Sequence, residues 1–155
     1  PPTSTRLIGW TSPPDGIIKL NFDGSLSPVG AAAGYILRDS SGQLLKVGTR
    51  FMYDVSILVT EVTALHDGLK AAFDVGMIHL QIEGDNHMVS QAVKGDIHIH
   101  WRIQMPIHDI RTMLSNFTSP TIQHVFREGN MDAYWITKLG VLLKTDLTSS
   151  HSPFL

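Results

Sequence analysis

The stretch Ile17-Ile18-Lys19-Leu20-Asn21-Phe22-Asp23 decides the fold of this chain. Its apolar residues at positions 18, 20 and 22 alternate with polar residues, and this period predicts a strand with one apolar face. The other face ends on a carboxylate, Asp23. We therefore take residues 17–23 as the first strand of the domain and work outward from it.

A three-stranded antiparallel meander is expected to begin with that strand. Residues 24–28 predict a turn, and residues 31–39 and 43–52 predict the second and third strands. Residues 40–42, Ser-Ser-Gly, are typical of a hairpin turn between them.

Helices and strands alternate in the rest of the chain. The predicted elements are a helix over residues 57–75, a strand over 77–83, a short helix ending near 95, a helix over 102–117, a strand over 121–126 and a helix over 131–143. The helix between the third and fourth strands requires a crossover connection. The order βββαβααβα therefore predicts the α/β class, with a mixed sheet that has helices on its faces.

A single domain is expected for 155 residues. Residues 1–16 contain four prolines and predict an extended lead-in or linker. Residues 17–145 are expected to form the domain, and residues 146–155 a flexible tail. The chain opens on Pro1, which favours a piece of a longer polypeptide.

Composition narrows the classes of function. Hydrophobic residues make up 43% and charged residues 17%, which is typical of a globular protein. No apolar run approaches the roughly 20 residues that span a bilayer, and the first residues lack a signal-peptide pattern. The absence of cysteine excludes disulfides and is compatible with a reducing compartment, so we expect an intracellular protein of the nucleus or cytoplasm. The net charge of −2 predicts that nucleic-acid binding is local and depends on metal.

Three acids stand out by their positions. Asp23 ends the first strand, Glu61 lies in the first turns of the long helix, and Asp85 follows the fourth strand. If those two strands are neighbours, their ends bring the aspartates together, and a helix packed across the sheet adds the glutamate. Acids that close repel one another unless cations lie between them, and Mg²⁺ prefers oxygen ligands. Two such ions about 3.5–4 Å apart would clamp the attacking and leaving oxygens of a phosphodiester.

Each of these acids also has a structural interpretation. An aspartate before glycine, as at Asp23, is a common turn residue. Asp85 is placed to cap a helix, and Glu61 to interact favourably with a helix dipole. Spacing alone does not decide between these interpretations and a metal site.

Several segments, taken together and in order, carry a family resemblance. They are residues 10–25, 33–42, 60–69, 82–86, 124–130 and 138–140. They resemble the ribonuclease H-like domain of plants, which is related to the ribonuclease H domain of non-LTR retrotransposon reverse transcriptases. The resemblance covers about residues 10–145 and implies a mixed five-stranded sheet flanked by helices.

The resemblance also implies a reaction. Asp23, Glu61 and Asp85 match the first three catalytic carboxylates of the family, which bind Mg²⁺ or Mn²⁺. The implied activity is endonucleolytic hydrolysis of the RNA strand of an RNA–DNA hybrid.

Four further residues are candidates for contact with the substrate. The resemblance places the backbone around Gly24 and Ser25 near the RNA 2′-hydroxyls. Asn86 stands where relatives often carry serine, and is a further candidate. Arg127 closes the last strand, where it would either pair locally or reach a phosphate.

At the fourth carboxylate of the family, this chain departs from the pattern. Relatives follow Arg-Glu-x-Asn with two residues and then Ala-Asp, whereas this chain has Tyr134 in that register. A neutral phenol, with a reference pKa of about 10, is a poor ligand for Mg²⁺. Asp132 lies two residues earlier, about 200° around a helix, and is expected to cap the helix or make a surface contact. Tyr134 therefore predicts a slow enzyme.

Histidines offer a weaker alternative metal site. His98, His100 and His108 lie near one another in sequence, but zinc requires three or four converging ligands and this chain has no cysteine. His124 is interpreted as a core histidine within the last strand.

Large apolar residues outside the motifs are interpreted as packing. This group contains Trp101, Met105, Met113, Met131 and Trp135. An alternative role for Trp135 is stacking on a base.

Two functions of different classes therefore remain open. The leading hypothesis is the metal-dependent hybrid endonuclease. The rival, suggested by Tyr134, is a catalytically degenerate module that binds nucleic acid or a protein partner.

Overall fold

The computed structural model describes residues 9–95, 98 and 101–150. Its elements are β1 (Ile18–Ser27), β2 (Gly30–Arg38), β3 (Leu44–Met52), α1 (Ile57–Asp74), β4 (His79–Gly84), α2 (His87–Lys94), α3 (Trp101–Leu114), β5 (Thr118–His124), the 3₁₀ turn η1 (Arg127–Asn130), α4 (Met131–Leu143) and β6 (Leu147–Ser150). The predicted α/β order of strands and helices is confirmed up to α4.

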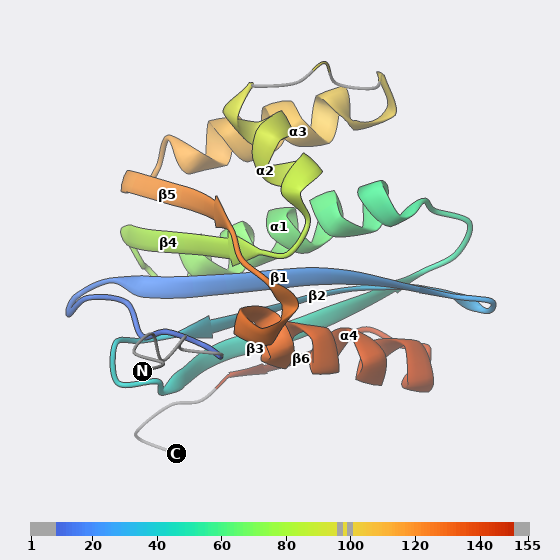
Figure 1. Ribbon diagram of the computed structural model, residues 1–155, viewed down its shortest axis with the longest axis horizontal. Helices are drawn as coiled ribbons and strands as arrows, with labels where there is room; N and C mark the ends of the chain where they lie inside the picture. The colour runs from blue at the N-terminus through green and yellow to red at the C-terminus, as the bar shows by residue number, and fades with distance from the viewer. Residues whose placement is uncertain (1–8, 96–97, 99–100, 151–155) are drawn as a thin grey trace, which may run out of the picture.

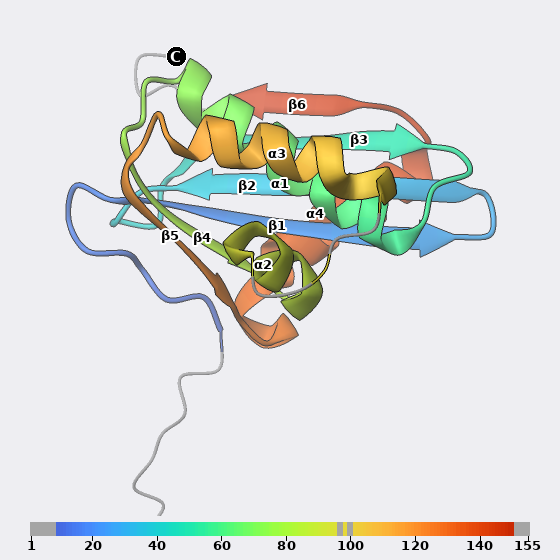
Figure 2. The same ribbon diagram turned by 90° about the horizontal axis from the view of Figure 1, so that it is seen from above.

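The sheet is mixed, and its strand order is β5-β4-β1-β2-β3-β6. β1, β2 and β3 form the predicted antiparallel meander, while β4 pairs in parallel with both β1 and β5. Helices α1, α2 and α3 lie on one side of this sheet and α4 on the other (Figure 1). Seen from above, α3 lies over α1, so that side of the sheet carries two layers of helices (Figure 2).

The predicted count of five strands is wrong, because β6 adds a sixth. β6 pairs antiparallel with β3 at the edge of the sheet. Its residues, Leu147–Ser150, fall in the segment interpreted as a flexible tail. Backbone hydrogen bonds to a neighbouring strand order a polar segment that has no apolar period of its own. Residues 151–155 and 1–8 of the predicted tail and lead-in lie outside the described residues.

The core lies between β1 and α1, as the apolar period predicts. Leu20, Phe22, Leu65 and Leu69 are fully buried there. The polar face of β1 is buried as well, because β1 is central in the sheet and α4 covers its other side. A strand with both faces buried must find partners for its polar side chains.

β1 is longer than predicted and runs on to Ser27, so most of the turn predicted at residues 24–28 is wrong. Gly24 explains the continuation. A Cβ at this position would lie 3.0 Å from the backbone nitrogen of Glu61 and 3.0 Å from Cγ2 of Thr60. Here glycine therefore serves the close approach of α1 to β1 rather than a turn.

Among the described residues, no helix has the length and apolar character needed to cross a membrane.

Candidate functional site

Neighbouring strands bring the first two acids together. β1 and β4 are parallel with Phe22 opposite Gly84, so Asp23 and Asp85 follow next to each other along the two strands. The two aspartates are therefore side by side, as predicted from the order of elements. The prediction that Asp23 ends the first strand is wrong, because β1 continues to Ser27.

Helix α1 supplies the third acid. The Ser56 hydroxyl caps α1 by accepting a hydrogen bond from the Val59 backbone nitrogen at 3.2 Å, which fixes where the helix begins. Glu61 then falls in the second turn, where the helix meets β1 at Gly24. The close approach of helix and strand directs the glutamate toward Asp23 on β1.

Asp23, Glu61 and Asp85 form what we call the acidic cluster. Each contributes one carboxylate oxygen, and these oxygens all lie within 4.8 Å of one another. Asp23 and Glu61 are buried, at 1% and 4% exposure, while the Asp85 side chain is 12% exposed. Oδ2 of Asp23 and Oε2 of Glu61 are buried without a hydrogen-bond partner in the described part of the chain. Buried oxygens without donors suit a cation.

Burial and mutual repulsion raise the pKa values of two acids in the cluster. Burial, followed by the Asp85 charge, raises the pKa of Asp23 to about 7. Burial, followed by the charges of Asp23 and Asp85, raises the pKa of Glu61 to about 9. Without a cation, the cluster therefore holds protons near neutral pH. A divalent ion would favour the ionised forms and displace them.

Among the described residues, Arg127 is a cation that contacts the cluster. Its Nε donates to Oδ2 of Asp85 at 3.4 Å. Its guanidinium carbon also lies 4.7 Å from the ring centre of Tyr134. In the described residues the acidic cluster has three members, Asp23, Glu61 and Asp85. Asp132 forms an ion pair with Arg38 at 2.5 Å, which confirms the predicted surface contact.

Other candidates have local structural roles as well. Ser25 is buried within β1, and Gly24 faces α1. The Asn86 side chain caps α2 by accepting from the backbone nitrogen of Val89 at 3.2 Å. The helix cap considered for Asp85 therefore belongs to its neighbour, which leaves Asp85 to the cluster.

A second polar group behind the cluster was not predicted. Lys19 and Glu83 form a buried ion pair at 2.7 Å. The Asn21 amide donates to Glu83 at 3.2 Å and to Asn130 at 3.0 Å, and the Asn130 amide donates to the backbone oxygen of Phe22 at 2.8 Å. We call Lys19, Asn21, Glu83 and Asn130 the buried network. It ties the start of α4 to β1, next to Asp23. The alternation of Lys19, Asn21 and Asp23 was the available signal.

Several packing predictions are wrong. His124, interpreted as a core residue, is exposed, and its ring lies 5.2 Å from that of His87. Trp101, Met105 and Trp135 are 69%, 67% and 60% exposed. α3 and α4 each bury one face and leave the other exposed, so hydrophobicity alone overestimated the burial of these side chains. Met113 does pack against the core, as predicted.

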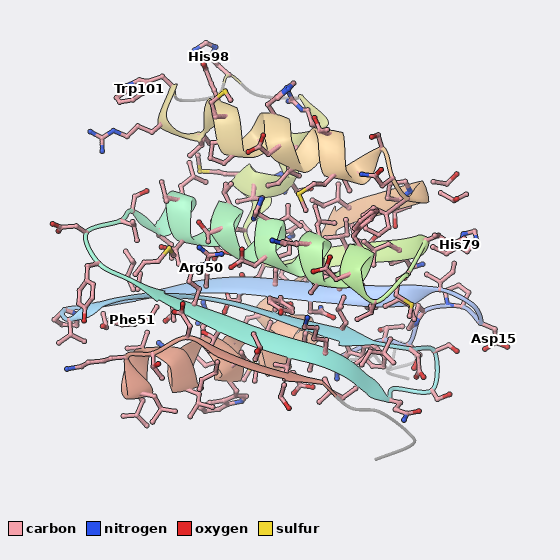
Figure 3. The ribbon with its side chains drawn as sticks, turned by 180° about the vertical axis from the view of Figure 1, so that it is seen from behind. Asp15, Arg50, Phe51, His79, His98 and Trp101 are labelled. Atoms are coloured by element: carbon pink, nitrogen blue, oxygen red, sulfur yellow. The ribbon has the colours of Figure 1, made fainter. Side chains whose placement is uncertain are left out.

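The histidine alternative gains no support from the described residues. Exposed His98 and Trp101 project from the same end of the molecule, away from the sheet (Figure 3). His100 lies outside the described residues. The acidic cluster is the group of potential metal ligands found in the part that the structure describes.

Comparisons with known proteins agree with this architecture. The model of a family described as "Reverse transcriptase-like" matches residues 21–140. A protein of Arabidopsis thaliana, "Putative ribonuclease H protein At1g65750", is 28% identical over 131 residues, which cover 83% of this chain and 21% of that protein. The chain thus spans about a fifth of that relative's length.

Similar solved structures come from diverse sources. RNase H1 of the halophilic archaeon Halobacterium salinarum NRC-1 has a TM-score of 0.76 and 23% identity, over 83% of this chain and 99% of that one. The N-terminal RNase H domain of rv2228c from Mycobacterium tuberculosis has a TM-score of 0.78 and 17% identity, over 82% and 94%. LC11-RNase H1, solved in complex with an RNA/DNA hybrid, has a TM-score of 0.70 and 17% identity, over 79% and 94%. These likenesses establish the fold.

Proposed function

The chain belongs to the reverse transcriptase-like family and has the ribonuclease H fold, and from this premise we propose that it is a metal-dependent endonuclease. Its substrate would be the RNA strand of an RNA–DNA hybrid. The observation that carries the proposal is the acidic cluster, because three carboxylates within 4.8 Å suit hard divalent cations. An enzyme for hybrids would act inside the cell, in the nucleus or cytoplasm.

Asp23, Glu61 and Asp85 would hold Mg²⁺ or Mn²⁺. The orphaned oxygens of Asp23 and Glu61 fit this role, since each is buried and lacks a donor in the described part of the chain. A divalent ion bound there would stabilise the charge that develops on the phosphate and make water a better nucleophile.

The protein's own groups would position the hybrid. Close packing of α1 on Gly24 leaves no room for a larger residue, so the cluster and the β1 backbone are held in a fixed relation. Ser25 and the backbone around it would lie along the RNA strand, and Asn86, at the start of α2, would border the same strand. Arg127, held 3.4 Å from Asp85, would turn toward a phosphate.

Tyr134 sets the expected rate. The Tyr134 ring carries no negative charge that could bind a metal ion, and the Arg127 guanidinium packs against this ring. A site with three acids and an adjacent cation has less negative charge than a site with four acids. We therefore propose a slow enzyme, with Mn²⁺ and Mg²⁺ as the metals to compare.

Cleavage of a labelled hybrid tests the proposal. We expect cleavage with Mg²⁺ or Mn²⁺, none with chelator, and a loss of at least about 100-fold in Asp85→Asn. Asp109→Asn is the matched control, because Asp109 is an exposed acid on α3 outside the cluster. Absence of cleavage, or equal rates in wild type and Asp85→Asn, would reject the nuclease.

A second function is favoured by one specific observation, the contact of Arg127 with both Asp85 and Tyr134. An internal cation that already neutralises one acid suits a degenerate module that binds nucleic acid or a protein partner without turnover. This module would bind its ligand equally well with metal and with chelator, whereas the nuclease would bind hybrid more tightly with metal.

A further inference from the structure

Exposed rings and cations gather where β5 leads through η1 into α4. Phe126 and Trp135 are 69% and 60% exposed, and the Arg127 side chain is 60% exposed. With Tyr134 and Lys138 they form what we call the aromatic–cationic surface. Large exposed apolar groups that cluster on a surface mark binding sites more often than isolated ones do.

The two exposed rings are held in place by neighbouring rings. Phe126 meets His124 edge to face, with ring centres 5.8 Å apart. Trp135 meets Tyr134 in the same way at 5.4 Å. Rings that are already oriented lose less freedom when a ligand stacks on them. The arrangement therefore suits a flat ligand better than loose side chains would.

Tyr134 holds the two cations. The Arg127 guanidinium lies 4.7 Å and the Lys138 ammonium 5.0 Å from the centre of its ring. Cations over an aromatic ring are attracted by its electron-rich face. A tyrosine at this position thus organises positive charge beside the exposed rings.

This surface borders the acidic cluster. Arg127 donates to Asp85, so one side chain connects the cluster to the Tyr134 ring. A polynucleotide with its phosphate at the cluster would extend past Arg127 onto the neighbouring rings.

We propose that the aromatic–cationic surface binds single-stranded nucleic acid that flanks the hybrid. Unpaired bases would stack on Phe126 and Trp135, and phosphates would pair with Arg127 and Lys138. Stacking platforms interleaved with cations bind single strands with little sequence preference, whereas bases within a duplex present no free ring face. This inference rests on the proposed function only for the identity of the ligand as a nucleic acid.

Fluorescence anisotropy with chelator present tests the inference without catalysis. The probes are a labelled short oligothymidylate, a blunt RNA–DNA hybrid and the same hybrid with a single-stranded overhang. We expect wild type to bind the oligothymidylate and to prefer the overhang to the blunt hybrid. Phe126→Ala and Trp135→Ala should each weaken oligothymidylate binding by roughly 5- to 150-fold. Lys138→Gln should lower the slope of log affinity against log salt by about 0.7.

Two control variants distinguish binding at this surface from non-specific binding to exposed apolar side chains. Trp101→Ala removes a tryptophan of similar exposure on α3, on the side of the sheet opposite α4 (Figure 3). Leu142→Ala removes a 76% exposed apolar residue from α4 itself. Both should leave affinity within about twofold, and circular dichroism checks that every variant is folded.

The outcomes separate this inference from the nuclease proposal. Unchanged affinity in Phe126→Ala and Trp135→Ala, or equal loss in Trp101→Ala, would overturn the inference and leave the surface to a protein partner. Failure of cleavage together with ring-dependent binding would reject the nuclease and support the binding surface. Cleavage together with binding that does not depend on the rings would support the nuclease and overturn the binding surface.

Discussion

The buried network and the acidic cluster both use residues of β1 and residues at the end of β4, and they differ in how their charges are balanced. The network adds Asn130 from η1, and the cluster adds Glu61 from α1. In the network, the Glu83 carboxylate has a cation at 2.7 Å and an amide donor at 3.2 Å. In the cluster, three acids meet, and two of them keep buried oxygens without donors. The network is complete within the protein, whereas the cluster needs something from outside. That difference distinguishes a group that stabilises the fold from a group kept for chemistry.

The largest effect is expected from breaking the network. Lys19→Met leaves the Glu83 carboxylate buried without its cation, so the free energy of unfolding should fall by about 3–5 kcal/mol. Urea titration monitored by circular dichroism measures this free energy of unfolding. The control is Arg50→Met, because Arg50 pairs with Asp67 with half of its side chain exposed, and loss of that pair should cost less than about 1 kcal/mol. An equal loss of unfolding free energy in the two variants would show that the buried pair contributes no more to stability than the exposed pair.

Metal should act on the cluster and leave the network unchanged. At about 100 times the dissociation constant, Mg²⁺ or Mn²⁺ should raise the free energy of unfolding by about 2.7 kcal/mol. Asp23→Asn should abolish this gain, because a cluster oxygen loses its charge. Asp132→Asn should keep it, since Asp132 pairs with Arg38 instead. Thermal unfolding with titrated metal measures the effect, and an equal response in Asp23→Asn would place the metal elsewhere.

Removing a charge from the cluster should stabilise the metal-free protein, whereas removing a charge from the network should destabilise it. Burial and the neighbouring acids raise the pKa of Glu61 from 4.5 to about 9, so the folded state holds a proton that the unfolded state releases between those values. Stability should therefore fall as pH rises through that window. Glu61→Gln mimics the protonated form and should stabilise by about 1–3 kcal/mol near the upper end of the window.

The pH profile of unfolding in chelator checks the sign. Glu61→Gln should flatten the fall in stability with pH. Glu128 is an exposed acid outside the cluster, so Glu128→Gln should leave this fall unchanged. A wild-type protein that gains stability across the window would contradict the account of the cluster given above.

The cluster's position was predictable from the sequence because it follows from strand order. A crossover helix makes β4 parallel to β1, and the register of these neighbours, with Phe22 opposite Gly84, sets Asp23 beside Asp85. α4 was predicted from Met131 to Leu143, the bounds that the structure has. The catalytic roles of the three acids stay predictions.

The network and β6 were less predictable for a physical reason. Glu83 meets Lys19 through strand pairing, and Asn130 joins from a distant 3₁₀ turn. The local alternation of Lys19 and Asn21 therefore does not indicate which residues they contact. β6 has no apolar alternation, since its order comes from backbone pairing with β3. Likewise, Gly24 was interpreted as a turn residue because sequence shows a glycine's freedom but not the helix that packs on it.

The smallest effect on stability is expected at Tyr134, whose ring contacts Arg127 beside the acidic cluster. Tyr134 is half-buried in the first turn of α4 and contacts Arg127, so Tyr134→Asp replaces a ring–cation contact with an ion pair of similar strength. The free energy of unfolding should change by less than about 1 kcal/mol. A fourth carboxylate beside the cluster should nevertheless lower the metal concentration at half-maximal stabilisation severalfold and increase hybrid cleavage.

Tyr134→Phe is the matched variant, because it keeps the ring and adds no charge. It should leave the metal midpoint unchanged and keep the Arg127 contact. If Tyr134→Asp also leaves the midpoint unchanged, position 134 lies outside the reach of the metal, and the chain must use its three acids alone. If it tightens metal binding without increasing cleavage, the lost acid is not what limits the rate, and the contact of Arg127 with Asp85 becomes the next feature to remove.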